Sequence, residues 1–142
     1  MEFNHFLTSY MPNVNIGSKV HFENMLKESV LAEKCGYATV SIPEHHLINL
    51  LMMPSPLQMA VKIASITKKI NITTGIVVLP IHDMRTYAGE VTTADILTDG
   101  RLILGVGRGA FPWEMERLGT PIETSKEKFV ESLEVLQLLL KD

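Results

Sequence analysis

The sequence lacks most of the features that mark specialised classes of protein. Cys35 is the one cysteine among 142 residues, which excludes an internal disulfide and any metal site built from several cysteines. Lysine and arginine number 13 against 16 acidic residues, so the basic excess of a nucleic-acid-binding protein is missing. No apolar run reaches the roughly 18 residues of a membrane span, and the first residues do not read as a signal peptide. We therefore expect a cytoplasmic globular protein whose partners include neither nucleic acid nor membrane.

What the sequence does contain is a regular alternation of strand and helix patterns. Apolar and β-branched runs predict strands at residues 3–10, 37–42, 70–79 and 101–106. Helical spacing of apolar residues and end signals predict helices at residues 21–34, 55–68, 83–98 and 125–140, with a short helical piece at 113–118. Such alternation is typical of parallel strands joined by right-handed crossovers. The chain is thus predicted to be a single α/β domain, residues 1–142, of four βα units.

Two architectures fit this order of elements: an open doubly wound sheet and part of a (β/α) barrel. Residues 105–110, GVGRGA, match a loose dinucleotide-binding fingerprint. However, they follow the fourth strand, and Phe111-Pro112 interrupts the helix that would receive a pyrophosphate. Glu44 and Arg108 both lie just past the ends of strands, where barrel enzymes keep their chemistry. The sequence therefore favours a parallel, TIM-barrel type of fold with about four units present, a half-barrel.

The most suggestive cluster is Glu44-His45-His46, in the loop that leaves the second strand. Two imidazoles beside a carboxylate can act as a base, as hydrogen-bond donors or as metal ligands. The alternative is that one histidine caps the loop and the other is solvated. Adjacent histidines of an extended loop point apart, and no ligand follows at H-E-x-x-H spacing, so we predict no metal site. His5 and His82 could converge with the cluster, although nothing in their spacing requires it.

Glycines mark two further positions near predicted strand ends. Arg108 lies between two glycines, so a ligand can approach the backbone closely while the guanidinium reaches an anion such as phosphate. The alternative is that the glycines form a tight turn and Arg108 pairs with Glu114 or Glu116. Gly75 interrupts a strand of bulky residues, which indicates a bulge or the close approach of a ligand or of another backbone segment.

Taken together, these segments resemble the bacterial luciferase-like flavin monooxygenase family over essentially the whole chain. Each matching stretch is short, but their order and spacing together are specific. The stretches are residues 32–37 (AEKCGY), 43–46 (PEHH), 54–57 (PSPL), 74–80 (TGIVVLP), 95–102 (DILTDGRL) and 105–109 (GVGRG).

The resemblance implies a (β/α)₈ barrel and an oxidoreductase activity. Members of the family take reduced FMN from a partner flavin reductase and use it with O₂ to oxidise an aldehyde or another small organic substrate. By motif position, His45 resembles the active-site base of the family, with Glu44 and His46 supporting it. Some relatives with the same barrel use a deazaflavin, which stands as the alternative cofactor.

The resemblance also implies which residues contact the cofactor. The segment Thr74, Gly75 and Ile76 resembles the one that lies against the flavin ring, where the family often has a cis peptide bond without proline. Gly107 occupies the position of a reactive cysteine in the light-emitting members, so that thiol is absent here. Arg108 resembles the arginine that reaches the flavin phosphate.

The chain departs from the family pattern chiefly in length. A full barrel takes about 250 residues, whereas four units would leave the first and fourth strands as unpaired apolar edges. We therefore expect either another chain at these edges or a longer protein of which this is the N-terminal half. A non-catalytic half-barrel that associates with itself or with a partner is the alternative function. The second and third helices resemble the surface through which the family dimerises, so a homodimer or other homo-oligomer is expected.

Overall fold

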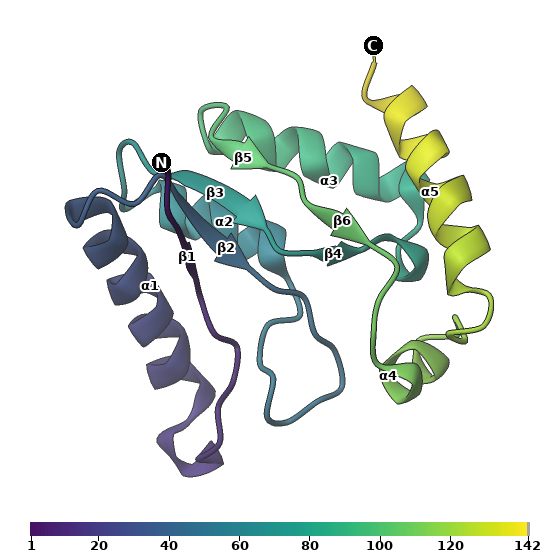
Figure 1. Ribbon diagram of the computed structural model, residues 1–142, viewed down its shortest axis with the longest axis horizontal. Coiled ribbons are helices and arrows are strands. Elements are labelled where there is room, and N and C mark those ends of the chain that lie inside the picture. Colours follow the sequence, from purple (N-terminus) through teal and green to yellow (C-terminus); the bar gives the residue numbers. More distant parts are fainter. Residues whose placement is uncertain (142) are drawn as a thin grey trace.

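Four parallel strands form the main sheet of the computed structural model, which describes residues 1–141 (Figure 1). The strands pair in the order β1-β2-β3-β5, which is their order along the chain. They are β1 (Asn4–Phe6), β2 (Thr39–Ile42), β3 (Asn71–Thr74) and β5 (Leu102–Ile103). The parallel register aligns Ile42 with Thr74, so the loops that follow β2 and β3 leave the sheet at the same edge. The predicted parallel α/β fold is confirmed.

Strands β3 and β5 are each interrupted, and a short strand follows each of them after the break. β4 (Val77–Val78) pairs in parallel with β6 (Val106–Gly107) as a separate ladder. The interruption indicated by Gly75 is confirmed, whereas the prediction of an unbroken strand at 101–106 was wrong at Gly105. Gly75 donates its N–H to the carbonyl of Ile42, and a Cβ at Gly105 would collide with the carbonyl of Thr74. The backbones therefore meet too closely here for an ordinary ladder.

The helices follow the strands in the predicted places with shifted ends. They are α1 (Ser18–Lys34), α2 (Pro56–Ala64), α3 (Met84–Leu97), α4 (Pro112–Arg117) and α5 (Ser125–Leu139), with 3₁₀ turns η1 (Val14–Ile16) and η2 (Leu79–Ile81). α1 begins one turn earlier than predicted, directly after Gly17 with its positive φ of 80°. Asp83 caps α3 as predicted, by accepting the backbone N–H of Arg85. Within residues 1–141, none of the helices has both the length and the apolar character needed to cross a membrane.

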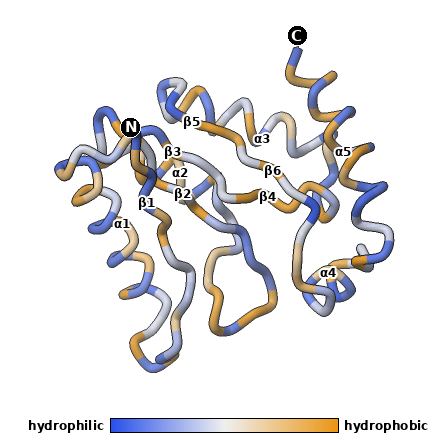
Figure 2. Tube along the Cα trace, viewed as in Figure 1, coloured by the Kyte–Doolittle hydropathy of each residue, from blue (hydrophilic) through white to orange (hydrophobic). Residues whose placement is uncertain are grey.

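The hydrophobic core lies between the sheet and the helices that cover it. Val40, Ile42 and Ile72 point from the strands into one buried cluster with Met25 of α1 and Ile63 of α2. A second cluster joins the β4 region to α3 and α5 through Val77, Leu79, Tyr87, Val91 and Leu136. Figure 2 shows the hydrophobic colour along β4 and β5. Alternation along the strands leaves the other sheet face more polar.

Glu33, near the end of α1, joins α1 to the turn before β3. One oxygen of its carboxylate accepts the backbone N–H groups of Lys68, Lys69 and Ile70 at 2.8, 2.7 and 3.0 Å. Burial acts to raise the pKa of Glu33, but these three donors and the charge of Arg101 outweigh it and lower the pKa below its usual value. The ionised carboxylate therefore stabilises this turn.

Arg101 holds the same end of the sheet together from the other side. Its guanidinium donates to the carbonyl of Ala64 at 2.9 Å, to the hydroxyl of Thr67 at 3.0 Å and to the carbonyl of Ile70 at 3.2 Å. These bonds satisfy carbonyls at the end of α2 and in the turn that follows it. They lie at the amino ends of the strands, the side of a barrel whose residues serve stability.

We expect Glu33→Gln to lower the free energy of unfolding by about 1 kcal/mol near neutral pH, because a neutral amide accepts these hydrogen bonds less strongly at a half-exposed site. A lowered folded-state pKa gives stability that is present above the unfolded value of 4.5 and is lost as the pH falls through the folded value. The difference between variant and wild type should therefore shrink in acid, as measured by urea unfolding. Glu23→Gln, at an exposed site of the same helix, is the control. A deficit that persists unchanged in acid contradicts the expectation.

Candidate active site

Polar residues from three loops converge at the carboxyl ends of the strands. Glu44 and His45 follow β2, Gly75 and Ile76 separate β3 from β4, and Arg108 follows β6. They meet around a cavity of about 240 Å³. Its full lining is Pro43, Glu44, His45, Gly75, Ile76, Val78, Gly107, Arg108, Gly109, Ala110, Phe111 and Glu114.

The two adjacent histidines point in different directions, as the sequence predicted. The segment is extended at this point, because the N–H of His45 donates to the carbonyl of Met53 at 2.9 Å in an antiparallel bridge. Alternate side chains of an extended segment share one side. Glu44 and His46 therefore lie together, with His46 Nε2 at 2.9 Å from Glu44 Oε1. The His45 ring lies instead beside Phe111, with ring centroids 5.4 Å apart.

Glu44 is a buried carboxylate whose two oxygens are both hydrogen-bonded. Its residue is 3% exposed. Oε1 accepts from Nε2 of His46 at 2.9 Å and from Nε2 of His82 at 2.8 Å, while Oε2 accepts the backbone N–H of Val78 at 2.6 Å. Burial acts to raise the pKa of Glu44, but the two histidines and Val78 outweigh it and hold the pKa below its usual value. The hydrogen bond to Glu44 in turn raises the pKa of His46.

His82 does converge with this cluster, as the sequence left open, whereas His5 bonds to Glu28 instead. His82 lies just past η2 and reaches Glu44 across 38 residues of sequence. Its ring stacks on Tyr87 of α3, with centroids 4.3 Å apart and an interplanar angle of 25°. Burial and the nearby charge of Glu44 raise the pKa of the Tyr87 phenol. The available signal was that His82, like Glu44, follows a strand whose end meets the same edge of the sheet.

Glu114 of α4 is a second buried carboxylate at the cavity, 4% exposed. It accepts the backbone N–H of His46, and its Oε2 lies 3.6 Å from Nδ1 of His45. That separation is too long for a hydrogen bond, and Nδ1 is buried without a partner among residues 1–141. The sequence analysis considered Glu114 as a partner for Arg108. In the described part of the chain, Arg108 is exposed and forms no ion pair.

Four of the five predicted cofactor residues line the cavity. The peptide bond between Gly75 and Ile76 is cis, the conformation that the family resemblance implies. A Cβ on Gly107 would lie 2.7 Å from Cδ1 of Ile76, so a larger residue here would require the Ile76 side chain to shift. Arg108 follows directly, at the rim. Thr74 does not line the cavity. It is fully buried, and its hydroxyl donates to the carbonyl of Gly105 at 2.7 Å, so it joins the two interrupted strands.

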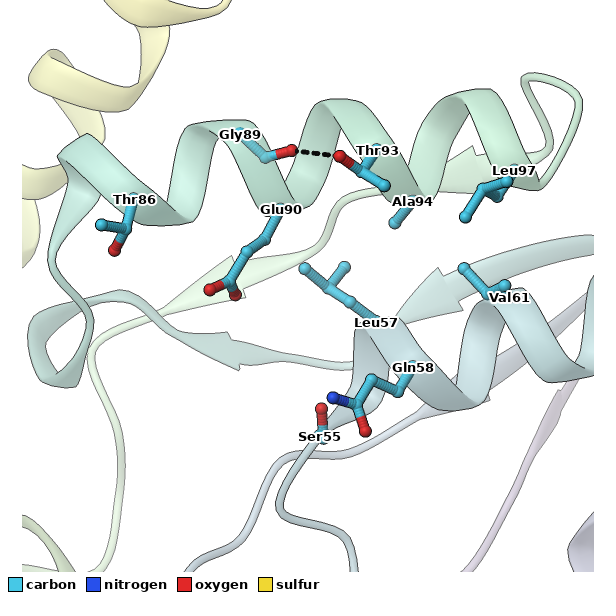
Figure 3. Close-up of a pocket in the computed structure, with 10 residues that line it drawn as sticks. All are labelled: Ser55, Leu57, Gln58, Val61, Thr86, Gly89, Glu90, Thr93, Ala94 and Leu97. Carbon is cyan, nitrogen blue, oxygen red and sulfur yellow. Dashed lines mark hydrogen bonds between the residues drawn. The ribbon is translucent and has the colours of Figure 1, made fainter.

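A larger groove of about 720 Å³ lies elsewhere, between α2 and α3 (Figure 3). Leu57 and Val61 of α2 face Ala94 and Leu97 of α3 across it. Its described lining contains one ionisable side chain, Glu90. The smaller cavity is the better candidate for chemistry, because two buried carboxylates, a histidine and an arginine converge there.

We expect Glu44→Gln to lower the free energy of unfolding by about 3 kcal/mol, because an amide places an N–H donor where donors already point and removes a buried charge that is compensated. Chemical denaturation followed by circular dichroism would measure the loss. Glu90→Gln, at an exposed site of α3, should change stability by much less. Equal stability of Glu44→Gln and wild type would show that the carboxylate is not needed.

Comparison with known proteins gives relatives along the whole chain. The uncharacterised protein y4vJ of Sinorhizobium fredii is 33% identical over 141 residues, which are 99% of this chain and 40% of that protein. The oxygenase component of the flavin-dependent trigonelline monooxygenase of Acinetobacter baylyi is 33% identical over 97 residues, 68% of this chain and 27% of that protein.

A solved structure shares the fold. It is the oxygenating constituent of 3,6-diketocamphane monooxygenase of Pseudomonas putida in complex with FMN. It matches with a TM-score of 0.88 at 24% identity, over 96% of this chain and 38% of that one. The chain thus spans 40% or less of the length of these three proteins. Since its sequence matches the family of luciferase-like monooxygenases over residues 1–142, the chain belongs to that family.

Proposed function

We propose that this chain carries part of a flavin site, at the carboxyl ends of its strands. The enzyme would be a monooxygenase that uses reduced FMN and O₂ to oxidise an aldehyde or another small organic substrate. The observation that carries the proposal is the cavity in which Arg108, the glycine-lined strand break and His45 converge. Membership of a family of flavin-dependent enzymes supports the cofactor class.

The residues at the cavity fit FMN in type and placement. The ring of FMN is flat and its phosphate is a dianion. Gly75, Ile76 and Gly107 offer backbone and apolar surface for the ring, and Arg108 offers a guanidinium that no carboxylate in residues 1–141 neutralises. Complete small-molecule pockets enclose roughly 300–1,000 Å³. The cavity of about 240 Å³ fits a site with further walls contributed from outside these residues.

His45 is the group in this chain best placed to move a proton. It lines the cavity, whereas His46 points away to Glu44. Bound FMN would supply the redox chemistry with O₂, and His45 would take a proton from a reacting substrate group or return one. Glu114, with Oε2 at 3.6 Å from Nδ1 of His45, is a positioning residue for the His45 ring. Glu44 and His46 act on His45 by holding the loop between them.

We expect the chain to bind reduced FMN in an anaerobic titration, and Arg108→Ala to weaken binding about 10- to 100-fold through the loss of a charge-assisted bond to phosphate. Arg117→Ala is the matched control, because the Arg117 guanidinium lies over the Trp113 ring, 5.1 Å from its centroid. Titration with a reduced deazaflavin in parallel tests the alternative cofactor. Absence of FMN binding, or equal affinities of the Arg108 and Arg117 variants, would contradict the proposal.

A separate flavin reductase is part of the proposal. The trigonelline relative is named as an oxygenase component, which supports a partner that supplies the reduced flavin. The small organic substrate and O₂ would meet at the cavity, and we place this chemistry in the cytoplasm.

A second candidate function is association through the outer helices without catalysis. The groove between α2 and α3 is bordered by apolar side chains, and Ile96 and Leu97 near it are 68% and 56% exposed. β1 and β5 also lie at the two ends of the strand order, each with one edge unpaired in the described residues. Contacts at this groove would give a homodimer.

We expect light scattering to give the mass of a dimer, because burial of the exposed apolar side chains favours association. Leu97→Lys should shift the mass towards the monomer, since a charge in the contact would be desolvated. Lys126→Glu on α5, outside the groove lining, serves as the control. A monodisperse monomer of wild type would eliminate this candidate.

A further inference from the structure

We propose that Glu44, His46 and His82 form a binding site for one divalent transition-metal ion, with Zn²⁺ as the representative. Glu44 borders the flavin cavity but neither histidine lines it, so the metal site can be tested without any flavin present. The sequence predicted no metal site, because the two adjacent histidines were expected to point apart. They do, and the separation leaves His46 on the side of Glu44, where His82 joins it.

The three candidate ligand atoms already converge. Glu44 Oε1 lies 2.9 Å from Nε2 of His46 and 2.8 Å from Nε2 of His82, and all three atoms lie within 4.8 Å of one another. Zinc bonds of about 2.0–2.1 Å place neighbouring ligand atoms of a tetrahedron about 3.3 Å apart. An ion would therefore need these side chains to open by about half an ångström, which rotation about their side-chain bonds supplies.

Binding of an ion requires a free lone pair on the Nε2 atom of each histidine. In the ion-free arrangement both Nε2 atoms carry hydrogens directed at one carboxylate oxygen. A neutral imidazole can carry its hydrogen on Nδ1 instead, which leaves the Nε2 lone pair for a metal. Both Nε2 atoms and Oε1 of Glu44 would then direct lone pairs at one cation.

The ligand set selects the class of metal. Two imidazoles and one carboxylate suit zinc and neighbouring transition metals, whereas magnesium and calcium take oxygen ligands. The same set of two histidines and one glutamate occurs in zinc sites that keep a fourth position open for water or another ligand. Glu44 adds a compensating negative charge at 1% side-chain exposure.

Each ligand is held in place by a separate contact. The second oxygen of Glu44 accepts the N–H of Val78 at 2.6 Å, and the backbone N–H of His46 donates to Glu114. The His82 ring stacks on Tyr87. Ligands fixed in advance lose little freedom when an ion binds.

The site is also accessible, and an ion there would cross-link two loops. The side chains of His46 and His82 are 21% and 22% exposed. His82 also lines a hollow of about 440 Å³ beside the start of α3, which offers a route for the ion. A bound ion would join the loop after β2 to the segment before α3 and so fix the loop that carries His45.

Isothermal titration of the flavin-free, chelator-treated chain with Zn²⁺ tests the site. We expect one ion per chain with a Kd on the order of micromolar. His82→Ala and His46→Ala should each weaken binding at least about 100-fold, since loss of an outer-shell partner alone costs 10- to 100-fold. His5→Ala removes a histidine bonded to Glu28 and should bind as wild type does. No binding by wild type, or equal affinity of wild type and His82→Ala, would overturn the proposal.

The visible spectrum of Co²⁺ decides the matter without any variant, should the alanine variants fail to fold. Co²⁺ bound by His46, His82 and Glu44 should show the intense absorption of four- or five-coordinate cobalt, and equimolar Zn²⁺ should abolish it. The weak spectrum of hydrated cobalt after addition to the chain would overturn the proposal. Because no flavin is present, failure here leaves the flavin site untouched, and failure of flavin binding leaves the metal result standing.

Discussion

The parallel register of β2, β3 and β5 is the constraint on which the site depends. Ile42 lies opposite Thr74, and Thr73 lies opposite Ile103. Three loops of unrelated sequence therefore leave the sheet at one edge and bring their side chains together. The amino ends carry the opposite kind of residue: Glu33 and Arg101 bond to backbone groups there. The amino ends of the strands thus stabilise the fold, while the carboxyl ends are available for chemistry.

Burial of the Glu44 charge organises that second end. An isolated carboxylate at 3% exposure would be very costly, and donors from three segments compensate it. Satisfying Glu44 fixes His46 and His82 in the same step, and it turns His45 to the other side, beside Glu114 and the cavity. The loop is therefore positioned by a group that need not take part in any reaction.

Much of the architecture was predictable from the sequence, because it follows from local patterns. The four βα units and their order follow from alternation of strand and helix periods, and the Asp83 cap follows from residue type. The interruption at Gly75 was indicated by its residue type, but the break at Gly105 was not placed, because it arises where two backbones meet across the sheet. Element order alone did not decide between a barrel and an open sheet, which the family relationship settled.

The candidate site was predictable in its residue types and less so in its connections. Glu44, His45 and Arg108 were identified from their places after strands, and all three line the cavity. His82 and Glu114 were not assigned to the site, because their partners lie 38 and 68 residues away in sequence. Long-range pairing of this kind depends on the register of the sheet, which no short motif encodes.

A crystal structure of the protein with reduced FMN tests the flavin site most directly. We expect the flavin ring to lie against Gly75 and Ile76, with its phosphate within hydrogen-bond distance of Arg108. A complex with the flavin bound in the groove between α2 and α3, or with its phosphate turned away from Arg108, would contradict the assignment of the strand-end cavity.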